Sequence, residues 1–364
     1  IANAVELEYY TYIKGDQLRK PMNNSKLNQI ALPIKMTVNL FKFQHEPILE
    51  NPYSKIDQHT LNCPLSKEGS IESLATYLGE IAKSDIEKAR AIYVWLCHNI
   101  SYDSSAYNSH QYGDTSADGV LKSRKSVCSG FSNLYLALGL KMGLEIEKVI
   151  GYAKGYSYKN GTRFKDTNHA WNIINIDGDW KVFDATWGEG YGTNVAGKLV
   201  CTKEFDNYWF NLDPIEAIFS HLPEDKTHAH VIPLIDLPTY EALPKINKGY
   251  FEIGFDAKTV YSEAYKNNSL KLPELYSSDT HVEVLKVPLD RVIKINHTYK
   301  LEIFVPHATE LSIIDSNKTW TKFEQERGVF NIQYSPTAKG KLKISAKIEG
   351  RGSSFHTILV YTVK

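Results

Sequence analysis

An Asp-Gly pair inside residues 167–187 constrains the fold of this chain more than any other feature. Asp177-Gly178 separates two runs in which apolar and polar residues alternate, which predicts a β-hairpin closed by a two-residue turn. The turn also fixes the register, because the strands pair residue by residue outward from it. His169 and Asp184 then lie diagonally across the hairpin, about 7–8 Å apart and within reach of a hydrogen bond.

A second stretch, residues 125–140, places a cysteine at the start of an apolar helix. Apolar residues recur at helical spacing from Phe131 to Leu138, and Gly143 follows as a terminator. Cys128 falls in the first turn of this helix. There the unpaired backbone N–H groups and the helix dipole favour the thiolate, which is the nucleophilic form of cysteine.

These two features together predict a catalytic triad. A nucleophile needs a base, and the base needs an orienting group, so Cys128, His169 and Asp184 are assigned these three roles in that order. The alternative is a buried structural cysteine, the usual state of a lone cysteine. No pair of cysteines has the close spacing of a zinc site, and neither a metal nor a cofactor is expected.

The segments that carry these residues resemble the transglutaminase-like superfamily. The motifs are ADGVLKSRKSVCSGF around Cys128, HAW at His169 and FDATW at Asp184. The segment EFDNYWFNLDPIEAIFSHLPED, residues 204–225, resembles the kyphoscoliosis-peptidase-like branch. The resemblance covers about residues 70–230, and it implies a core that is a circularly permuted relative of the papain fold.

Three parts are expected along the chain, because 364 residues exceed one typical domain. Residues 1–69 are interpreted as an N-terminal extension with one strand, over 34–43, and a connector. Residues 70–247 form the transglutaminase-like catalytic core. In residues 248–364, short alternating strands separated by turns predict an immunoglobulin-like β-sandwich. The expected fold class is α+β, with helices packed on an antiparallel sheet.

Two helices, over residues 71–82 and 84–99, are expected ahead of the nucleophile, and a capping box of Ser84 and Glu87 opens the second. Residues 103–118 follow as a polar loop, with no apolar tunnel that would exclude water. The roles of Trp171, Trp180 and Trp187 stay open between a substrate groove and the core. Other side chains are interpreted as structural or solvated: Trp95, Cys97, His98, His110, Gln111, Tyr112 and His221.

Composition narrows the expected partners. Lys plus Arg and Asp plus Glu are both 42, so neither nucleic acid nor an anionic membrane surface is expected as a partner. No apolar run approaches the roughly 18 residues that span a bilayer. Cys63, Cys97, Cys128 and Cys201 are too few for a disulfide scaffold. The chain begins at Ile1 rather than Met, which favours an extracytoplasmic or secreted location if it is a processed mature form.

The expected function is a cysteine-dependent acyl-transfer enzyme acting on peptide or amide bonds of a protein or peptide substrate. Hydrolysis, as by a protease or amidase, is favoured, because water reaches an exposed thioester before an amine does. Two alternatives stay open: transglutaminase-type cross-linking, and a non-catalytic binding or scaffold module built on the same core. A papain-type protease proper is disfavoured, since the C-G-[SA]-C-[WY] signature is absent.

Overall fold

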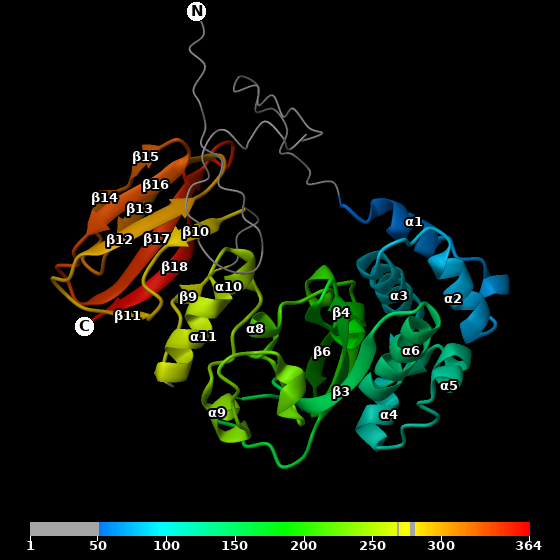
Figure 1. Cartoon of the computed structure of the whole chain (residues 1–364). Helices are drawn as coiled ribbons and strands as arrows, with labels where there is room; N and C mark the ends of the chain where they lie inside the picture. The colour runs from blue at the N-terminus through cyan, green and yellow to red at the C-terminus, as the bar shows by residue number, and fades with distance from the viewer. Residues whose placement is uncertain (1–50, 160, 268, 277–280) are drawn as a thin grey trace, which may run out of the picture. The chain divides into compact units, whose positions relative to one another are not determined.

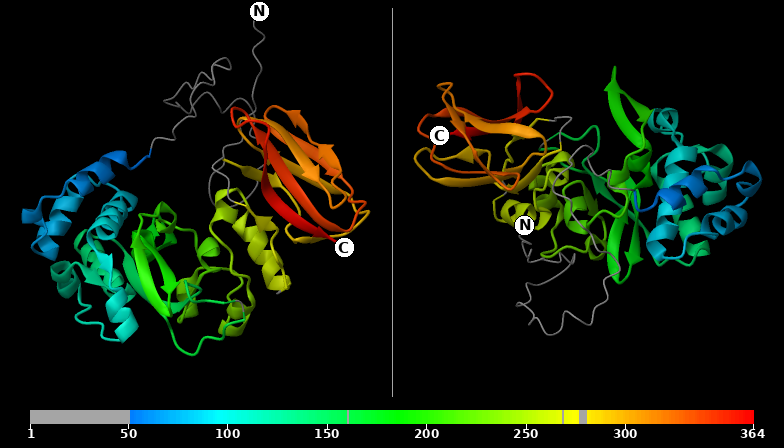
Figure 2. Two further views of the ribbon diagram at one scale, coloured as in Figure 1. Left: turned by 180° about the vertical axis from the view of Figure 1, so that it is seen from behind. Right: turned by 90° about the horizontal axis from the view of Figure 1, so that it is seen from above.

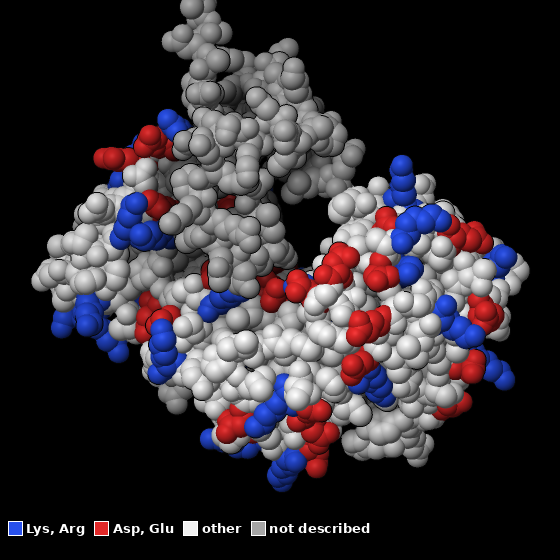
Figure 3. Space-filling model, viewed as in Figure 1, with Lys and Arg blue, Asp and Glu red and all other residues white. Residues whose placement is uncertain are grey.

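The computed structural model describes residues 51–364 except 160, 268 and 277–280 (Figure 1). Asn51 to Lys364 form one compact unit. The strand expected over residues 34–43 lies outside the described residues. None of the described helices is both long and apolar enough to cross a bilayer. On the face shown in Figure 3, acidic and basic side chains are interspersed over the helical part rather than gathered by sign.

Helices surround the segment that begins at Cys128. Both helices predicted ahead of it are present, and the predicted capping box is formed: Ser84 accepts a hydrogen bond from the Glu87 N–H, and the Glu87 carboxylate accepts one from the Ser84 N–H. Fully buried Trp95 and Leu134 belong to the cluster that holds these helices together. The helices are α1 (Ser54–Leu61), α2 (Ile71–Gly79), α3 (Asp85–Asn99), α4 (Ser104–Ser109), α5 (Ala117–Ser123) and α6 (Cys128–Lys141).

Two stretches that were predicted to lack helices are partly helical. The connector expected at the end of residues 1–69 contains α1, which is tied to α3 by the ion pair of Asp57 with Arg90. The polar loop predicted over residues 103–118 contains α4, whose first turn is capped by the Asp103 side chain. Both helices are short and polar, so they lack the apolar periodicity by which a helix is recognised in a sequence.

A four-stranded antiparallel sheet, in the order β5-β4-β3-β8, packs against α6. Figures 1 and 2 agree in showing α6 on one side of β3 and β4. The predicted hairpin is formed with the predicted register: Ile173 pairs with Val182, and Asp177 and Gly178 have positive φ of 54° and 94°. The strands are β3 (Ile146–Ala153), β4 (His169–Ile176), β5 (Asp179–Phe183) and β8 (His221–Pro223).

The rest of this part is irregular structure with short elements. The opposite face of the four-stranded sheet carries Trp171 and Ile173, which pack against Ala217. A small hairpin of two strands, β6 and β7, forms a separate sheet. The elements are α7 (Ala185–Glu189), β6 (Gly190–Val195), β7 (Lys198–Lys203), α8 (Pro214–Ala217), α9 (Leu237–Ala242), α10 (Gly249–Glu252) and α11 (Ala257–Lys266), with two-residue strands β1 (Ser101–Tyr102) and β2 (Lys125–Ser126).

The remaining strands form two sheets that fit the predicted β-sandwich. One has the order β10-β12-β16-β15, and the other has β11-β18-β17-β13-β14 with β9 beside β18. Ile303 of the first and Ile344 of the second belong to one buried cluster. The strands are β9 (Glu274–Leu275), β10 (Glu283–Lys286), β11 (Val292–Ile293), β12 (Tyr299–Phe304), β13 (Ala308–Ile314), β14 (Trp320–Lys322), β15 (Glu324–Glu326), β16 (Val329–Tyr334), β17 (Gly340–Ile348) and β18 (Phe355–Val363).

The start of this region differs from the prediction. Strands were expected from about residue 248, but α10 and α11 come first. Phe219, Tyr261 and Leu359 share one buried cluster, so apolar packing continues from the segment after the sheet into the sandwich. The α+β class is confirmed, with helices packed on an antiparallel sheet. The immunoglobulin-like arrangement and the domain boundaries stay predictions.

The ion pair between α1 and α3 generates a prediction about stability. Arg90 is 2% exposed and donates to both carboxylate oxygens of Asp57, at 2.7 and 2.8 Å. Asp57→Ala leaves this charge buried without its partner, which we expect to lower the free energy of unfolding by about 2–4 kcal/mol. Glu263→Ala, which removes the acid of the exposed pair with Lys266, is the control and should cost under about 0.5 kcal/mol. Equal losses in denaturant unfolding would contradict this account.

Candidate active site

The N-terminus of α6 leaves backbone donors free beside the cysteine. The N-cap residue is Val127, which has no side-chain acceptor for the first turn. The N–H groups of Gly130 and Phe131 both donate to the Val127 carbonyl, at 2.9 and 3.3 Å. The two N–H groups before them, of Cys128 and Ser129, have no partner within a helix. Cys128 is therefore the first helical residue, as the sequence predicts, with donors next to its sulfur.

His169 and Asp184 meet as the hairpin register predicts. His169 is the first residue of β4, and Asp184 directly follows β5 as the N-cap of α7. The distance from His169 Nε2 to Asp184 Oδ2 is 2.7 Å. Asp184 Oδ1 accepts the N–H groups of Thr186 and Trp187, at 2.9 and 3.0 Å. Capping α7 thus fixes the carboxylate that receives the imidazole.

A second histidine, His221, reaches the same carboxylate. Its Nε2 lies 3.1 Å from Asp184 Oδ2, and its Nδ1 lies 2.8 Å from Ser220 Oγ. Burial lowers the pKa of His221 more than the Asp184 charge raises it, so the ring is neutral and donates from Nε2. His221 was interpreted as structural from the sequence, and it reaches this carboxylate through the pairing of β8 with β3, where it lies opposite Ala153.

The thiol of Cys128 lies beside the imidazole of His169. Because His169 turns Nε2 toward Asp184, Nδ1 is left for the sulfur. Burial raises the pKa of the Cys128 thiol, but the hydrogen bond and charge of His169, with the Ala170 N–H, bring it below its ordinary value. Burial lowers the pKa of His169, yet Asp184 and Cys128 together raise it to about 10. The favoured state is a thiolate next to an imidazolium, and the cysteine is partly exposed.

Aromatic rings enclose the imidazole. Trp187 stacks on His169 with centroids 5.2 Å apart, and Trp209 meets Trp187 edge-on at 4.7 Å. Trp171 is 2% exposed and packs in the core under the sheet. Of the two roles left open by the sequence, it therefore has the core role rather than that of a groove wall. Trp180 packs against the same cluster as Trp171 and stacks on His230 with centroids 5.5 Å apart. The imidazole of His169 thus has two tryptophan neighbours, partly exposed Trp187 and buried Trp171, whose ring stacks on it at 5.9 Å.

Two tyrosines lie near the thiol, and the sequence did not single them out. Burial raises the pKa of Tyr102 and of Tyr107, and the charge of Cys128 raises both further. Both phenols therefore stay protonated and can donate a hydrogen bond. Their ring centroids are 6.3 Å apart, at the end of β1 and in α4. His110 Nδ1 lies 3.1 Å from the hydroxyl of Tyr112, and this contact is exposed to solvent.

The other side chains interpreted as structural are placed accordingly. Trp95 donates to the Glu68 carboxylate at 2.9 Å, and the Cys97 sulfur lies 3.5 Å from the Ala185 carbonyl oxygen. Trp95 and Cys97 are buried in the helical cluster. His98 stacks on a phenylalanine ring at 5.0 Å.

Three side chains could hold a metal ion in the described part of the chain. Ligand atoms of His169, Asp184 and His221 lie within 4.8 Å of one another. Both imidazole Nε2 atoms already hydrogen-bond to Asp184 Oδ2, and Oδ1 is occupied by the start of α7. The hydrogen-bonding atoms of this cluster are therefore satisfied without a metal ion. The absence of a metal stays a prediction.

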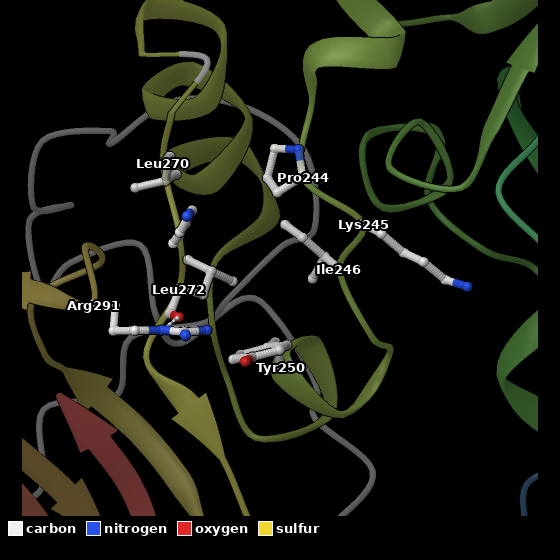
Figure 4. A pocket seen from close by; sticks show the side chains of 8 residues that line it. Pro244, Lys245, Ile246, Tyr250, Leu270, Leu272 and Arg291 are labelled. Atoms are coloured by element: carbon white, nitrogen blue, oxygen red, sulfur yellow. Dashed lines mark hydrogen bonds between the residues drawn. The ribbon is translucent and has the colours of Figure 1, made fainter. Parts of the chain in front are cut away.

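A cavity of about 260 Å³ lies elsewhere and contains none of these residues (Figure 4). Two of its three cations are engaged: Lys245 donates to the Gly155 carbonyl at 2.9 Å, and Arg291 to the Leu272 carbonyl at 3.1 Å. We therefore place no chemistry in it. Its lining residues are Pro244, Lys245, Ile246, Tyr250, Leu270, Lys271, Leu272 and Arg291.

Comparison with known proteins agrees with this arrangement. Residues 72–185, which include all three predicted triad residues, match the model of the transglutaminase-like superfamily. The chain has a transglutaminase-like core. Human kyphoscoliosis peptidase is 24% identical over 301 residues, which are 82% of this chain and 41% of that protein. The predicted resemblance to the superfamily and to its kyphoscoliosis-peptidase branch is confirmed.

Other relatives have a similar sequence identity to this chain. The Lim and transglutaminase domain protein ltd-1 of Caenorhabditis elegans is 25% identical over 232 residues, 60% of this chain and 31% of that protein. The chain spans about two fifths of the length of the kyphoscoliosis peptidases that it matches. A solved TGase structure has a TM-score of 0.24 at 17% identity, covering 40% of this chain and 35% of that one.

The environment of the four cysteines predicts selective alkylation. Burial raises the pKa of Cys63 to about 11 and also raises the pKa of Cys97 and Cys201, whereas His169 lowers that of Cys128. Iodoacetamide should modify Cys128 first, with a rate midpoint below the ordinary thiol value of about 8.5.

The same experiment with His169→Ala shows in which direction the imidazole shifts the pKa of Cys128. Without the imidazole, burial is the dominant effect on the thiol, so the midpoint should rise above that of an ordinary cysteine. Mass spectrometry of peptides from protein labelled over a pH series measures both midpoints. Equal labelling of all four cysteines, or an unchanged midpoint in His169→Ala, would contradict the placement of the imidazole.

Proposed function

We propose that this protein is a cysteine-dependent acyl-transfer enzyme that hydrolyses peptide or amide bonds. The observation that supports it is a partly exposed thiol with a lowered pKa, next to an imidazole that is held 2.7 Å from a buried carboxylate. Cys128 is the nucleophile, His169 the general acid and base, and Asp184 the orienter. The superfamily match adds support, since the matched segment contains all three residues.

In the first half of the reaction, the Cys128 thiolate attacks the carbonyl carbon and forms a C–S bond. The oxyanion that develops faces the N–H groups at the start of α6, which are fixed before the substrate arrives. His169 then gives its Nδ1 proton to the leaving nitrogen as the C–N bond breaks. A thioester and a free amine result.

In the second half, water attacks the thioester, and His169 removes its proton from the water. The C–S bond breaks, the acid leaves and the thiolate is restored. Asp184 keeps the imidazole tautomer and stabilises its charged form throughout. The Cys128 side is partly exposed, so water has access to the thioester.

The reaction class is tested by product analysis. A panel of glutamine-containing peptides is incubated with the protein, with and without excess primary amine. We expect hydrolysis products that disappear in Cys128→Ala. Amine incorporation that depends on Cys128 and exceeds hydrolysis would replace the hydrolase by a cross-linking transglutaminase. No product across the panel would favour the binding or scaffold module.

The role of the orienter is tested by Asp184→Asn. Asparagine keeps an oxygen that can cap α7 but cannot stabilise the imidazolium, so the fold should remain while activity falls. We expect kcat/KM to drop by about 10²–10⁴-fold, less than in Cys128→Ala. Circular dichroism is the control for folding. Full activity in Asp184→Asn would show that the carboxylate only caps the helix.

A further inference from the structure

A lysine contacts the first turn of α6 at the residue that follows the nucleophile. Lys148, on β3, is half-buried, and its Nζ lies 2.8 Å from Ser129 Oγ and 2.8 Å from Asn133 Oδ1. Ser129 directly follows Cys128, and Asn133 is one helical turn further along. The contacts fix the ammonium group in place before any ligand arrives, so binding there would cost little side-chain entropy.

The charge of Lys148 has no carboxylate partner in the part of the chain that the structure describes. Its two acceptors are neutral side chains. The neighbouring acids are engaged elsewhere: Glu147 pairs with His228 at 3.1 Å, and Glu145 accepts from the Asn175 amide at 2.7 Å. An ammonium has three hydrogens, so one donor remains available, and neither of its two acceptors neutralises its charge.

The Lys148 ammonium interacts electrostatically with the thiolate of Cys128. Burial lowers the pKa of Lys148, and the charge of Cys128 raises it. Both hydrogen bonds run from Nζ to a neutral oxygen, which is how an ammonium group donates. A cation at this place can attract an anionic group of whatever approaches the sulfur.

We propose that Lys148 is a specificity-determining residue that binds a carboxylate of the substrate next to the bond attacked by Cys128. The carboxylate is either the C-terminus of a peptide or an acidic side chain. The proposal deepens the proposed function and rests on it. The competing role, a purely structural tie between β3 and α6, predicts no preference for anions and is separated from it by experiment.

The first test compares two alkylating reagents on Cys128. Iodoacetate carries a carboxylate and iodoacetamide does not, and both form the same C–S bond as iodide leaves. The ratio of their rates therefore cancels any change in the pKa of the thiol. We expect Lys148→Gln to lower the ratio of iodoacetate to iodoacetamide about five- to tenfold, with a smaller difference at high salt.

Two variants serve as controls for the rate ratio. Lys148→Arg keeps the charge and should keep most of the ratio. Lys181→Gln removes the same charge from β5 of the same sheet, where Lys181 pairs with Asp213 at 3.2 Å, and should leave the ratio unchanged. If Lys148→Gln slows both reagents equally, Lys148 acts only on the thiolate and the proposal is wrong.

The second test measures binding without the reaction, in the Cys128→Ala protein. Short acetylated alanine peptides are titrated by NMR in three forms: a free C-terminus, a C-terminal amide, and a C-terminal amide with one internal Glu. We expect one carboxylate-bearing form to bind about five- to tenfold more tightly than the plain amide, and Lys148→Gln to remove the difference. The form that gains identifies the source of the carboxylate.

The two tests separate failure of this proposal from failure of the proposed function. An unreactive Cys128 in the wild-type protein counts against the enzyme, whereas the binding arm still reports on Lys148. Equal binding of all three peptides would overturn the carboxylate site, even if Cys128 reacts quickly.

Discussion

The buried carboxylate of Asp184 is the interaction on which the site depends. It is 1% exposed, and burying an ionised carboxylate costs several kcal/mol unless donors replace its hydration. Thr186 and Trp187 donate backbone N–H groups to one oxygen, and His169 and His221 meet the other. Burial alone raises the pKa of Asp184. The two imidazoles lower this pKa by more than burial raises it, so the carboxylate stays ionised. One carboxylate therefore fixes β4, β8 and the start of α7 together.

The parts of the site that could be predicted from the sequence are those set by local geometry. The Asp177-Gly178 turn fixes the hairpin register, so the contact of His169 with Asp184 follows from counting outward along the strands. Cys128 is placed by helix periodicity alone. His221 and Lys148 could not be predicted, because each reaches the site through tertiary packing. β8 has to pair with β3, and α6 has to pack on the same strand.

The elements of the fold could also be predicted where the sequence has a local pattern, and their prediction failed where it has none. Alternation along β12 and β17 shows in the sequence, since each strand has one buried and one open face. The helix α1 has no such pattern, and it is stabilised by the charge pair of Asp57 with Arg90 rather than by an apolar stripe. The predicted boundary at residues 247–248 rests on a change in sequence pattern. Packing does not stop there, because Phe219 and Leu359 share a cluster.

The contact of Lys148 with the first turn of α6 has a consequence for catalysis beyond binding. Before attack, the ammonium shares its charge with the Cys128 thiolate. Attack moves this negative charge from the sulfur onto the carbonyl oxygen at the start of α6, and the charge is lost from the site only when the oxyanion collapses to the thioester and the leaving nitrogen takes its proton. A substrate carboxylate at Lys148 would then interact with the whole charge, more strongly than in the first encounter complex. Interactions that strengthen along the reaction lower its barrier, whereas uniform binding does not. Lys148 would therefore affect kcat for anionic substrates as well as KM.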